Sequence, residues 1–247
     1  MCDVCDGFRP GWSRWQGWLD LPEARPVRPT GEWTDLSHCL TDGLSRIPTF
    51  PQPTFRRSRS LPEFTANVTE IQMVAHIGTH LDAPCHFIAD GPTADQVPLA
   101  RLHGPGVVWR IEVPALGVIG VEHLERATPR MQRGDIVLID TGWARHINTE
   151  AYEDHPALGA DAAEWLVRQG AKIVAVDFST PDLTAHKRPA DFTWPVHQTL
   201  LRHGVLIGEH MTNLTGLAGR AVEVMFLGLN IRHSDGMPAR VLARTID

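Results

Sequence analysis

The chain has 247 residues, 43% of them hydrophobic and 21% charged, and a formal net charge of −6 at pH 7. This length suits one large domain or two small ones, and a core of that size needs no disulfide bonds. The acidic balance, without long runs of like charge, argues against nucleic acid or an anionic membrane as a partner. The residues MCDVCDGFRPGW lack the apolar segment that a signal peptide contains, and no window approaches the roughly 18 apolar residues of a membrane span. We therefore expect a cytoplasmic protein with reduced cysteines.

Residues 1–30 are expected to form an irregular arm, because prolines interrupt any regular element there. Within it, Trp12, Trp15 and Trp18 recur every three residues. This spacing favours an arm that lies across the body of the protein or of a partner subunit, and a lid over a pocket is the alternative. Cys2 and Cys5 form a CxxC pair, but no second pair at zinc-finger spacing follows.

Strand-like and helix-like segments alternate along the rest of the chain. Loose alternation of polarity and runs of β-branched residues predict strands over residues 69–75, 107–113, 135–140, 172–178, 221–231 and 241–246. Apolar residues at helical spacing predict one helix that begins at Ala160 and is capped by Gly170, and another from about Trp194 to Gly204. The short basic run at residues 56–60 is interpreted as a solvated loop. Together these elements predict an α/β domain with a mixed sheet over residues 31–247.

The segment HIGTHLDAPCHF places three histidines and an aspartate within twelve residues. In an unbroken strand His76 and His80 would lie about 13 Å apart, too far to bind one metal ion. The chain must therefore curl between them, and Gly78 permits such a curl. Pro84 forces a second change of direction. The two interruptions of regular structure allow the side chains to converge.

Two imidazoles and a carboxylate, from His76, His80 and Asp82, suit Zn, Mn or Fe(II) and leave coordination positions open. Open positions are typical of a catalytic site rather than a closed structural one. His86 remains as a general acid or base, because the pKa of a free histidine lies near 6.5. A cysteine nucleophile is disfavoured, since Cys85 and His86 are adjacent and would point in opposite directions. The chain also has no GxSxG motif.

The same segment resembles the HxGTHxDxPxHF signature of the metal-dependent cyclase family, which includes bacterial kynurenine formamidases and isatin hydrolases. Other stretches resemble later blocks of that family over roughly residues 30 to 245. These stretches are ADGP with VPL, RGDIVLIDTGW, HQTLLRHGVLIGEHMTNL and the closing SDGMPARVL. The resemblance implies a single swivelling β/β/α domain that assembles as a homodimer or higher homo-oligomer through extended arms.

The resemblance also implies specific roles for residues of this chain. The metal ligands would be His76, His80 and Asp82 for a first ion, and the shared Asp82 with His197 and Glu209 for a second. His86 matches the position with an acid/base role. We therefore expect one or two divalent ions per chain, zinc or manganese. The residue after Glu209 is His210, where the family commonly has Gly or Asn.

Three functions are compatible with these residues. The first is hydrolysis of a small amide, either an aryl formamide such as N-formylkynurenine or a cyclic amide such as isatin. The second is the use of the same site on a lactone or in a polyketide-type ring closure. The third is metal binding without catalysis, which would leave His86 and the open coordination unexplained. A pocket lined by Phe50, Phe55, Trp143 or Phe178 would favour an aryl substrate, although each of them suits a core position equally well.

Overall fold

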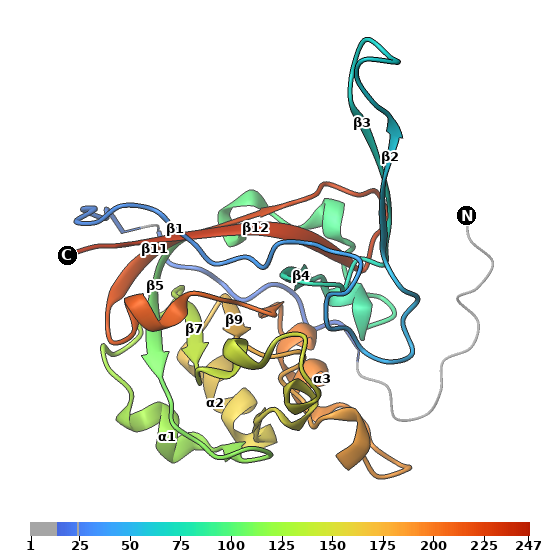
Figure 1. The fold of residues 1–247 in the computed structure, drawn as a ribbon. Helices are drawn as coiled ribbons and strands as arrows, with labels where there is room; N and C mark the ends of the chain where they lie inside the picture. The colour runs from blue at the N-terminus through green and yellow to red at the C-terminus, as the bar shows by residue number, and fades with distance from the viewer. Residues whose placement is uncertain (1–13, 24) are drawn as a thin grey trace.

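The computed structural model describes residues 14–23 and 25–247. Its longer elements form one central sheet and the helices beside it (Figure 1). The helices are α1 (Val121–Arg126), α2 (Ala160–Gln169) and α3 (Pro195–Arg202). The strands of the central sheet are β1 (Thr34–Asp35), β4 (His80–Asp82), β5 (His103–Arg110), β7 (Ile136–Asp140), β9 (Ile173–Val176), β10 (Leu206–Glu209), β11 (Ala221–Gly228) and β12 (Gly236–Thr245). Two small sheets pair β2 (Thr54–Arg59) with β3 (Val68–Gln72), and β6 (Val118–Ile119) with β8 (Ala157–Leu158).

The central sheet closes on itself. Its strands follow the order β1-β12-β11-β5-β7-β9-β10-β4, and β4 pairs a second time with β12. Seven strands therefore form a mixed barrel, to which β1 adds along β12. The strands β5, β7, β9 and β10 run parallel, whereas β4, β11 and β12 pair antiparallel with their neighbours. Closure leaves β4 without a free edge, although it has only three residues.

Alternation along the buried strands separates two parts of the core. In β7, Ile136 and Leu138 belong to the cluster that fills the barrel, whereas Val137 and Ile139 belong to the cluster under α2 and α3. Successive side chains of a strand point to opposite faces, so each parallel strand supplies both clusters. Both faces of these strands are covered, which explains why their sequences are continuous apolar runs.

Most predicted elements are confirmed, with bounds that shift by a few residues. The helix begun at Ala160 is α2, and Gly170 caps it with a left-handed φ of 81°. The predicted strands correspond to β3, β5, β7, β9, β11 and β12. The single α/β domain with a mixed sheet is confirmed, but its closure into a barrel was not foreseen. The swivelling β/β/α arrangement and the boundary at residue 30 stay predictions.

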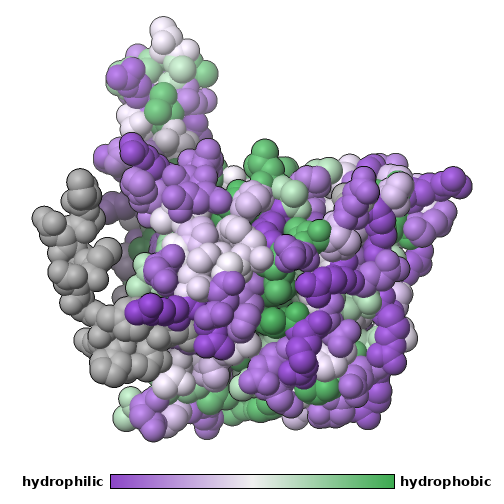
Figure 2. Space-filling model, turned by 180° about the vertical axis from the view of Figure 1, so that it is seen from behind, coloured by the Kyte–Doolittle hydropathy of each residue, from purple (hydrophilic) through white to green (hydrophobic). Residues whose placement is uncertain are grey.

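The basic run at residues 56–60 was wrongly interpreted as a loop, because most of it forms β2. This strand pairs with β3 in a hairpin that stands away from the barrel (Figures 1 and 2). Every residue of β3 is exposed, and so is nearly every residue of β2. A strand with water on both faces needs no apolar alternation, so its sequence carries no strand pattern. Figure 2 shows hydrophobic side chains among the hydrophilic ones on this hairpin.

The described part of the N-terminal arm packs on the body of the same chain. Trp18 packs against Gly204 at the end of α3, and the Arg101 guanidinium carbon lies 4.5 Å from the centre of its ring. Trp15 contacts Trp18 edge-on and packs on the core under the helices. Trp12 and the Cys2–Cys5 pair lie outside the described residues. Within the part of the chain that the structure describes, no helix is long and apolar enough to cross a membrane.

Candidate metal centre

The closing strand β4 carries the centre of the site. Leu81 points into the barrel core, so its neighbours His80 and Asp82 point to the other face, where α3 lies. The register of β10 against β4 places Glu209 directly opposite His80. Helix α3 contributes His197 from its first turn. Residues far apart in the sequence therefore meet because β4 pairs with β10 at one side and with β12 at the other.

The expected curl occurs at Gly78. Its φ of 67° is left-handed, a conformation that favours glycine, and the His76 and His80 ring centres lie 5.0 Å apart. A Cβ at this position would come within 2.6 Å of Leu40 and 2.9 Å of Leu44. The Gly78 carbonyl lies 2.8 Å from His80 Nδ1. If that nitrogen donates its proton to the carbonyl, the turn leaves His80 Nε2 with a lone pair for a ligand.

Four side chains form an alternating ring of two imidazoles and two carboxylates. His80 Nε2 lies 3.2 Å from Asp82 Oδ1 and 3.3 Å from Glu209 Oε2. His197 Nε2 lies 3.5 Å from Asp82 Oδ2 and 3.3 Å from Glu209 Oε1. Each carboxylate thus spans both imidazoles, with one oxygen toward each. We refer to His80, Asp82, His197 and Glu209 as the four-residue ring.

The polar atoms of this ring fit a divalent metal ion. His80 Nε2, Asp82 Oδ2 and Glu209 Oε1 are buried and have no hydrogen-bond partner. An unpaired buried polar group costs about 1–3 kcal/mol, so such atoms are rare unless something else binds them. Two ligands held at about 2.1 Å from one tetrahedral ion lie roughly 3.4 Å apart. The ring has N···O separations of 3.2–3.5 Å.

The charges of the ring also favour a cation. Burial opposes the ionisation of Asp82, but the surrounding histidines hold its pKa well below the usual range. Burial and the charge of Asp82 oppose the ionisation of Glu209, yet contacts with His197 and His80 lower its pKa to about 2. Burial disfavours protonated His80, but the two carboxylates raise its pKa to about 10. The anionic pair therefore attracts positive charge, which a metal ion can supply in place of the imidazole protons.

His76 and His86 lie beside the ring and stack on each other. Their ring centres are 3.9 Å apart, at an interplanar angle of 21°. His76 Nδ1 lies 2.8 Å from Asp82 Oδ1, and the ligand atoms of His76, His80 and Asp82 are close enough together to hold one ion. The structure therefore brings together all six residues that the sequence analysis singled out. Which of them bind metal and which transfer protons stays a prediction.

Two aspartates that the sequence analysis did not assign complete the arrangement. Asp235 Oδ2 lies 3.0 Å from His76 Nε2 and 3.2 Å from His86 Nδ1. Asp182 Oδ2 lies 2.6 Å from His197 Nδ1, and its two oxygens accept the first backbone N–H groups of α3. A carboxylate on one imidazole nitrogen orients the other nitrogen, a common arrangement in metal sites. Asp235 lies in the closing SDGMPARVL block, and that resemblance was its one sequence signal.

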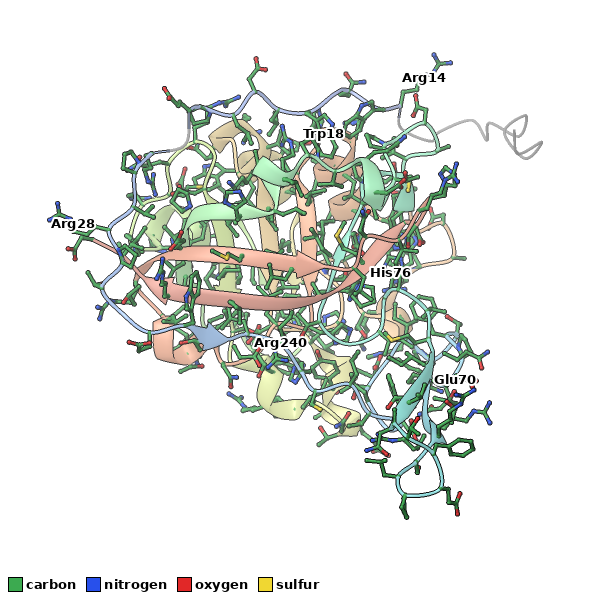
Figure 3. The ribbon with its side chains drawn as sticks, turned by 90° about the horizontal axis from the view of Figure 1, so that it is seen from above. Arg14, Trp18, Arg28, Glu70, His76 and Arg240 are labelled. Atoms are coloured by element: carbon green, nitrogen blue, oxygen red, sulfur yellow. The ribbon has the colours of Figure 1, made fainter. Side chains whose placement is uncertain are left out.

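An apolar cleft of about 670 Å³ opens beside His76, His86 and Asp235. Figure 3 shows His76 between the ends of β11 and β12 and the hairpin that carries Glu70. The other lining residues are mainly hydrophobic: Leu40, Phe50, Ile71, Met73, Val74, Ala75, Leu229, Ile231, Ser234 and Pro238. Of the four aromatic residues considered for this pocket, Phe50 lines it. Trp143 and Phe178 are instead buried in the core under the helices, and Phe55 is not among the lining residues.

Two other residues near the site are held in neutral forms. Burial and the charge of Asp235 raise the pKa of Cys85 to about 11, so its thiol is a poor nucleophile. Burial and the neighbouring His80 lower the pKa of His210 to about 3. The Tyr152 hydroxyl shares a 2.8 Å hydrogen bond with His210 Nδ1. His210 therefore packs behind His80 as a neutral side chain, with ring centres 5.9 Å apart, and leaves the four-residue ring intact.

Comparison with known proteins identifies the family. The Cyclase family model matches residues 34–183. A kynurenine formamidase of Bacillus cereus is 31% identical over 219 residues, which cover 88% of this chain and 99% of that protein. Isatin hydrolase A from Labrenzia aggregata superposes with a TM-score of 0.79 at 22% identity, covering 88% of this chain and 94% of the other. Isatin hydrolase A from Ralstonia solanacearum gives 0.76 at 22% identity, covering 86% and 91%. The chain belongs to the Cyclase family, with bacterial kynurenine formamidases among its relatives and the fold of the isatin hydrolases.

Proposed function

We propose that the protein is a metal-dependent hydrolase of small amides. The observation that carries this proposal is the four-residue ring, in which three buried polar atoms, His80 Nε2, Asp82 Oδ2 and Glu209 Oε1, lack hydrogen-bond partners. The ion is zinc or manganese, one or two per chain, because both accept imidazole and carboxylate ligands. The residues that would hold it are His76, His80, Asp82, His197 and Glu209. When bound, such an ion lowers the pKa of its water toward neutrality and polarises a carbonyl oxygen.

The remaining chemistry falls to His86. Its Nδ1 lies 3.2 Å from Asp235 Oδ2. Burial lowers the pKa of His86, and the negative charges of Asp82 and Asp235 act against that shift. Its Nε2 is then the atom that accepts a proton from the attacking water and returns it to the leaving nitrogen. About 22% of the His86 side chain is exposed, and it lines the apolar cleft, so a substrate can reach it. Asp235 acts as a positioning residue, because it holds both His76 and His86.

The substrate we propose is an aryl formamide such as N-formylkynurenine, or a cyclic amide such as isatin. The apolar cleft beside His86, with Phe50 in its wall, suits an aromatic ring next to the amide. The names of the relatives point to the same two compounds. Hydrolysis of a formyl amide releases formate and an amine as separate products. Hydrolysis of a cyclic amide opens the ring, so the nitrogen and the new carboxylate stay in one molecule.

A turnover panel on metal-replete protein tests this function. We expect hydrolysis of N-formylkynurenine or isatin, with turnover lost on treatment with a chelator and restored by zinc or manganese. A simple aryl lactone of similar size is the comparison substrate. Turnover of the lactone with neither amide hydrolysed would replace the proposed reaction by ester chemistry at the same site. Metal-loaded protein that acts on none of the three would contradict the proposal.

We also propose that the protein forms a homodimer or a higher homo-oligomer. The β2–β3 hairpin exposes Leu61, Phe64, Val68 and Ile71, each with between 43% and 59% of its surface accessible. An isolated two-stranded hairpin is marginally stable in water, so burial of these side chains against a second copy would stabilise it. Light scattering coupled to gel filtration should give at least twice the chain mass of 27.4 kDa. A monomer at micromolar concentration would contradict this assembly.

A further inference from the structure

The loop between β9 and α3 brings an arginine next to the metal centre. Arg188 lies near the end of this loop, which leaves the carboxyl end of a parallel strand. Its guanidinium carbon lies 3.7 Å from the centre of the Trp194 ring. The Trp194 ring centre in turn lies 5.7 Å from that of His197, in an edge-on contact. One aromatic ring therefore separates this guanidinium from the four-residue ring.

The stack on Trp194 holds Arg188 in a defined position. Its Nε donates a 2.7 Å hydrogen bond to the Leu183 carbonyl, and the guanidinium carbon lies 5.9 Å from the Phe192 ring centre. No hydrogen bond or ion pair in the described part of the chain engages its two terminal nitrogens. An arginine that is stacked and bonded through Nε presents those terminal N–H groups in a fixed fork, which suits a carboxylate.

The positive charge of Arg188 interacts with carboxylates of the metal centre. Burial lowers the pKa of Arg188, while the carboxylates of Asp182, Glu209 and Glu153 act against that shift. Asp182 and Glu209 are two of the three carboxylates that contact His197, and Asp82 is the third. Arg188 is half-buried and remains charged at neutral pH, so it offsets part of the negative charge that a carboxylate substrate would meet here.

The two sides of the site differ in chemistry. On one side, Phe50 and the hydrophobic residues of the cleft reach His76 and His86. On the other side, the Phe87 ring packs between His86 and His197. Its centre lies 4.7 Å from that of the His86 ring and 4.4 Å from that of the His197 ring. Phe87 also contacts Trp194, at 5.2 Å, and Arg188 lies on Trp194. The site is thus apolar at one end and cationic at the other.

We propose that Arg188 is a specificity-determining residue that binds a carboxylate group of the substrate. The substrate class is then an aryl amide that also carries a carboxylate, with its apolar part in the cleft and its carboxylate on the Arg188 fork. This inference rests on the proposed amide hydrolysis and adds a substrate requirement to it. A purely structural Arg188, which only ties Leu183 to Trp194, would affect neutral and anionic substrates alike.

The experiment compares two formamides that differ by one carboxylate, formanilide and N-formylanthranilate. The wild-type protein is expected to prefer N-formylanthranilate in kcat/KM. Arg188→Gln should raise KM for that substrate about 10- to 100-fold, the loss typical of one charge-assisted hydrogen-bonded pair. Its constants for formanilide should stay within about twofold of wild type, and Arg188→Lys should restore part of the lost affinity. Lys187→Gln, which removes the neighbouring exposed charge, is the matched control and should leave both substrates unchanged.

The possible results separate the two proposals. If the wild-type protein hydrolyses neither formamide, the inference fails, and the proposed function fails with it when N-formylkynurenine and isatin are not hydrolysed either. If it hydrolyses both and Arg188→Gln weakens both equally, the function stands and the carboxylate site is wrong. If Lys187→Gln reproduces the effect of Arg188→Gln, the preference reflects the general charge of the loop, which also overturns the inference. Calorimetry with anthranilate, on wild type and on Arg188→Gln, gives the same comparison at equilibrium without turnover.

Discussion

Asp82→Asn is expected to release the bound metal and to lower turnover by more than about 100-fold. Loss of a residue that only orients a metal ligand typically costs about 10- to 100-fold, and loss of a residue that binds the ion should cost more. Asp82 is the carboxylate that approaches His76, His80 and His197 together. The asparagine side chain keeps the volume but has no charge and only one acceptor oxygen. Elemental analysis of protein purified without chelators should therefore show almost no zinc or manganese.

Metal loss should also appear in stability. An ion present at about 1,000 times its Kd stabilises the folded protein by about 4 kcal/mol, so a chelator should lower the Tm of the wild type but not that of Asp82→Asn. Asp140→Asn is the matched control, because Asp140 is equally buried but contacts Arg110 and Gly142 instead. It should keep its metal. An Asp82→Asn protein that is folded and retains the metal content of the wild type would contradict the site.

A companion variant, Glu209→Gln, reports the number of ions. If Asp82 is shared by two ions and Glu209 serves the second, metal content should fall from about two ions per chain to about one. The structure adds a reason to measure this, because Glu209 contacts His80 as closely as it contacts His197. If the wild-type protein saturates at one ion and Glu209→Gln has the same metal content, Glu209 orients the ligand histidines and does not bind a second ion.

The first half of the site could be read from the sequence because its residues are close along the chain. His76, His80 and Asp82 lie within seven residues, so their meeting requires only the local turn at Gly78. His197 and Glu209 were assigned by resemblance to the family. Their convergence depends on the pairing of β10 with β4 and on the docking of α3, contacts between distant parts of the chain. Spacing alone contains no such information.

The two orienting aspartates show where sequence reasoning stops. Asp182 lies in a loop and Asp235 just before β12, and in a sequence each looks like an ordinary turn residue. Each gains its role only from a histidine that the fold places beside it. Barrel closure was missed for a related reason. The closing strand has three residues, and a strand that short produces no periodic pattern.

His86→Ala is expected to keep the metal of the wild type and to lose about 10²- to 10⁴-fold in kcat, the contribution typical of a general acid or base. His86 supplies no atom to the four-residue ring, and it lines the cleft. Removing its side chain deletes the group that accepts and returns the proton but leaves His80, His197 and both carboxylates in place. Turnover under saturating substrate, together with metal content, measures the two effects separately.

Asp235→Asn tests whether Asp235 positions His86 for proton transfer. Asp235 Oδ2 contacts His86 Nδ1 and His76 Nε2, so the amide would weaken the hold on both rings. We expect kcat to fall about 10- to 100-fold, as for other partners of site histidines, with little change in KM. His86 also lies close enough to Asp82 and His197 to share an ion with them. A His86→Ala protein that loses its metal would make His86 a ligand, and proton transfer would then have to come from another group.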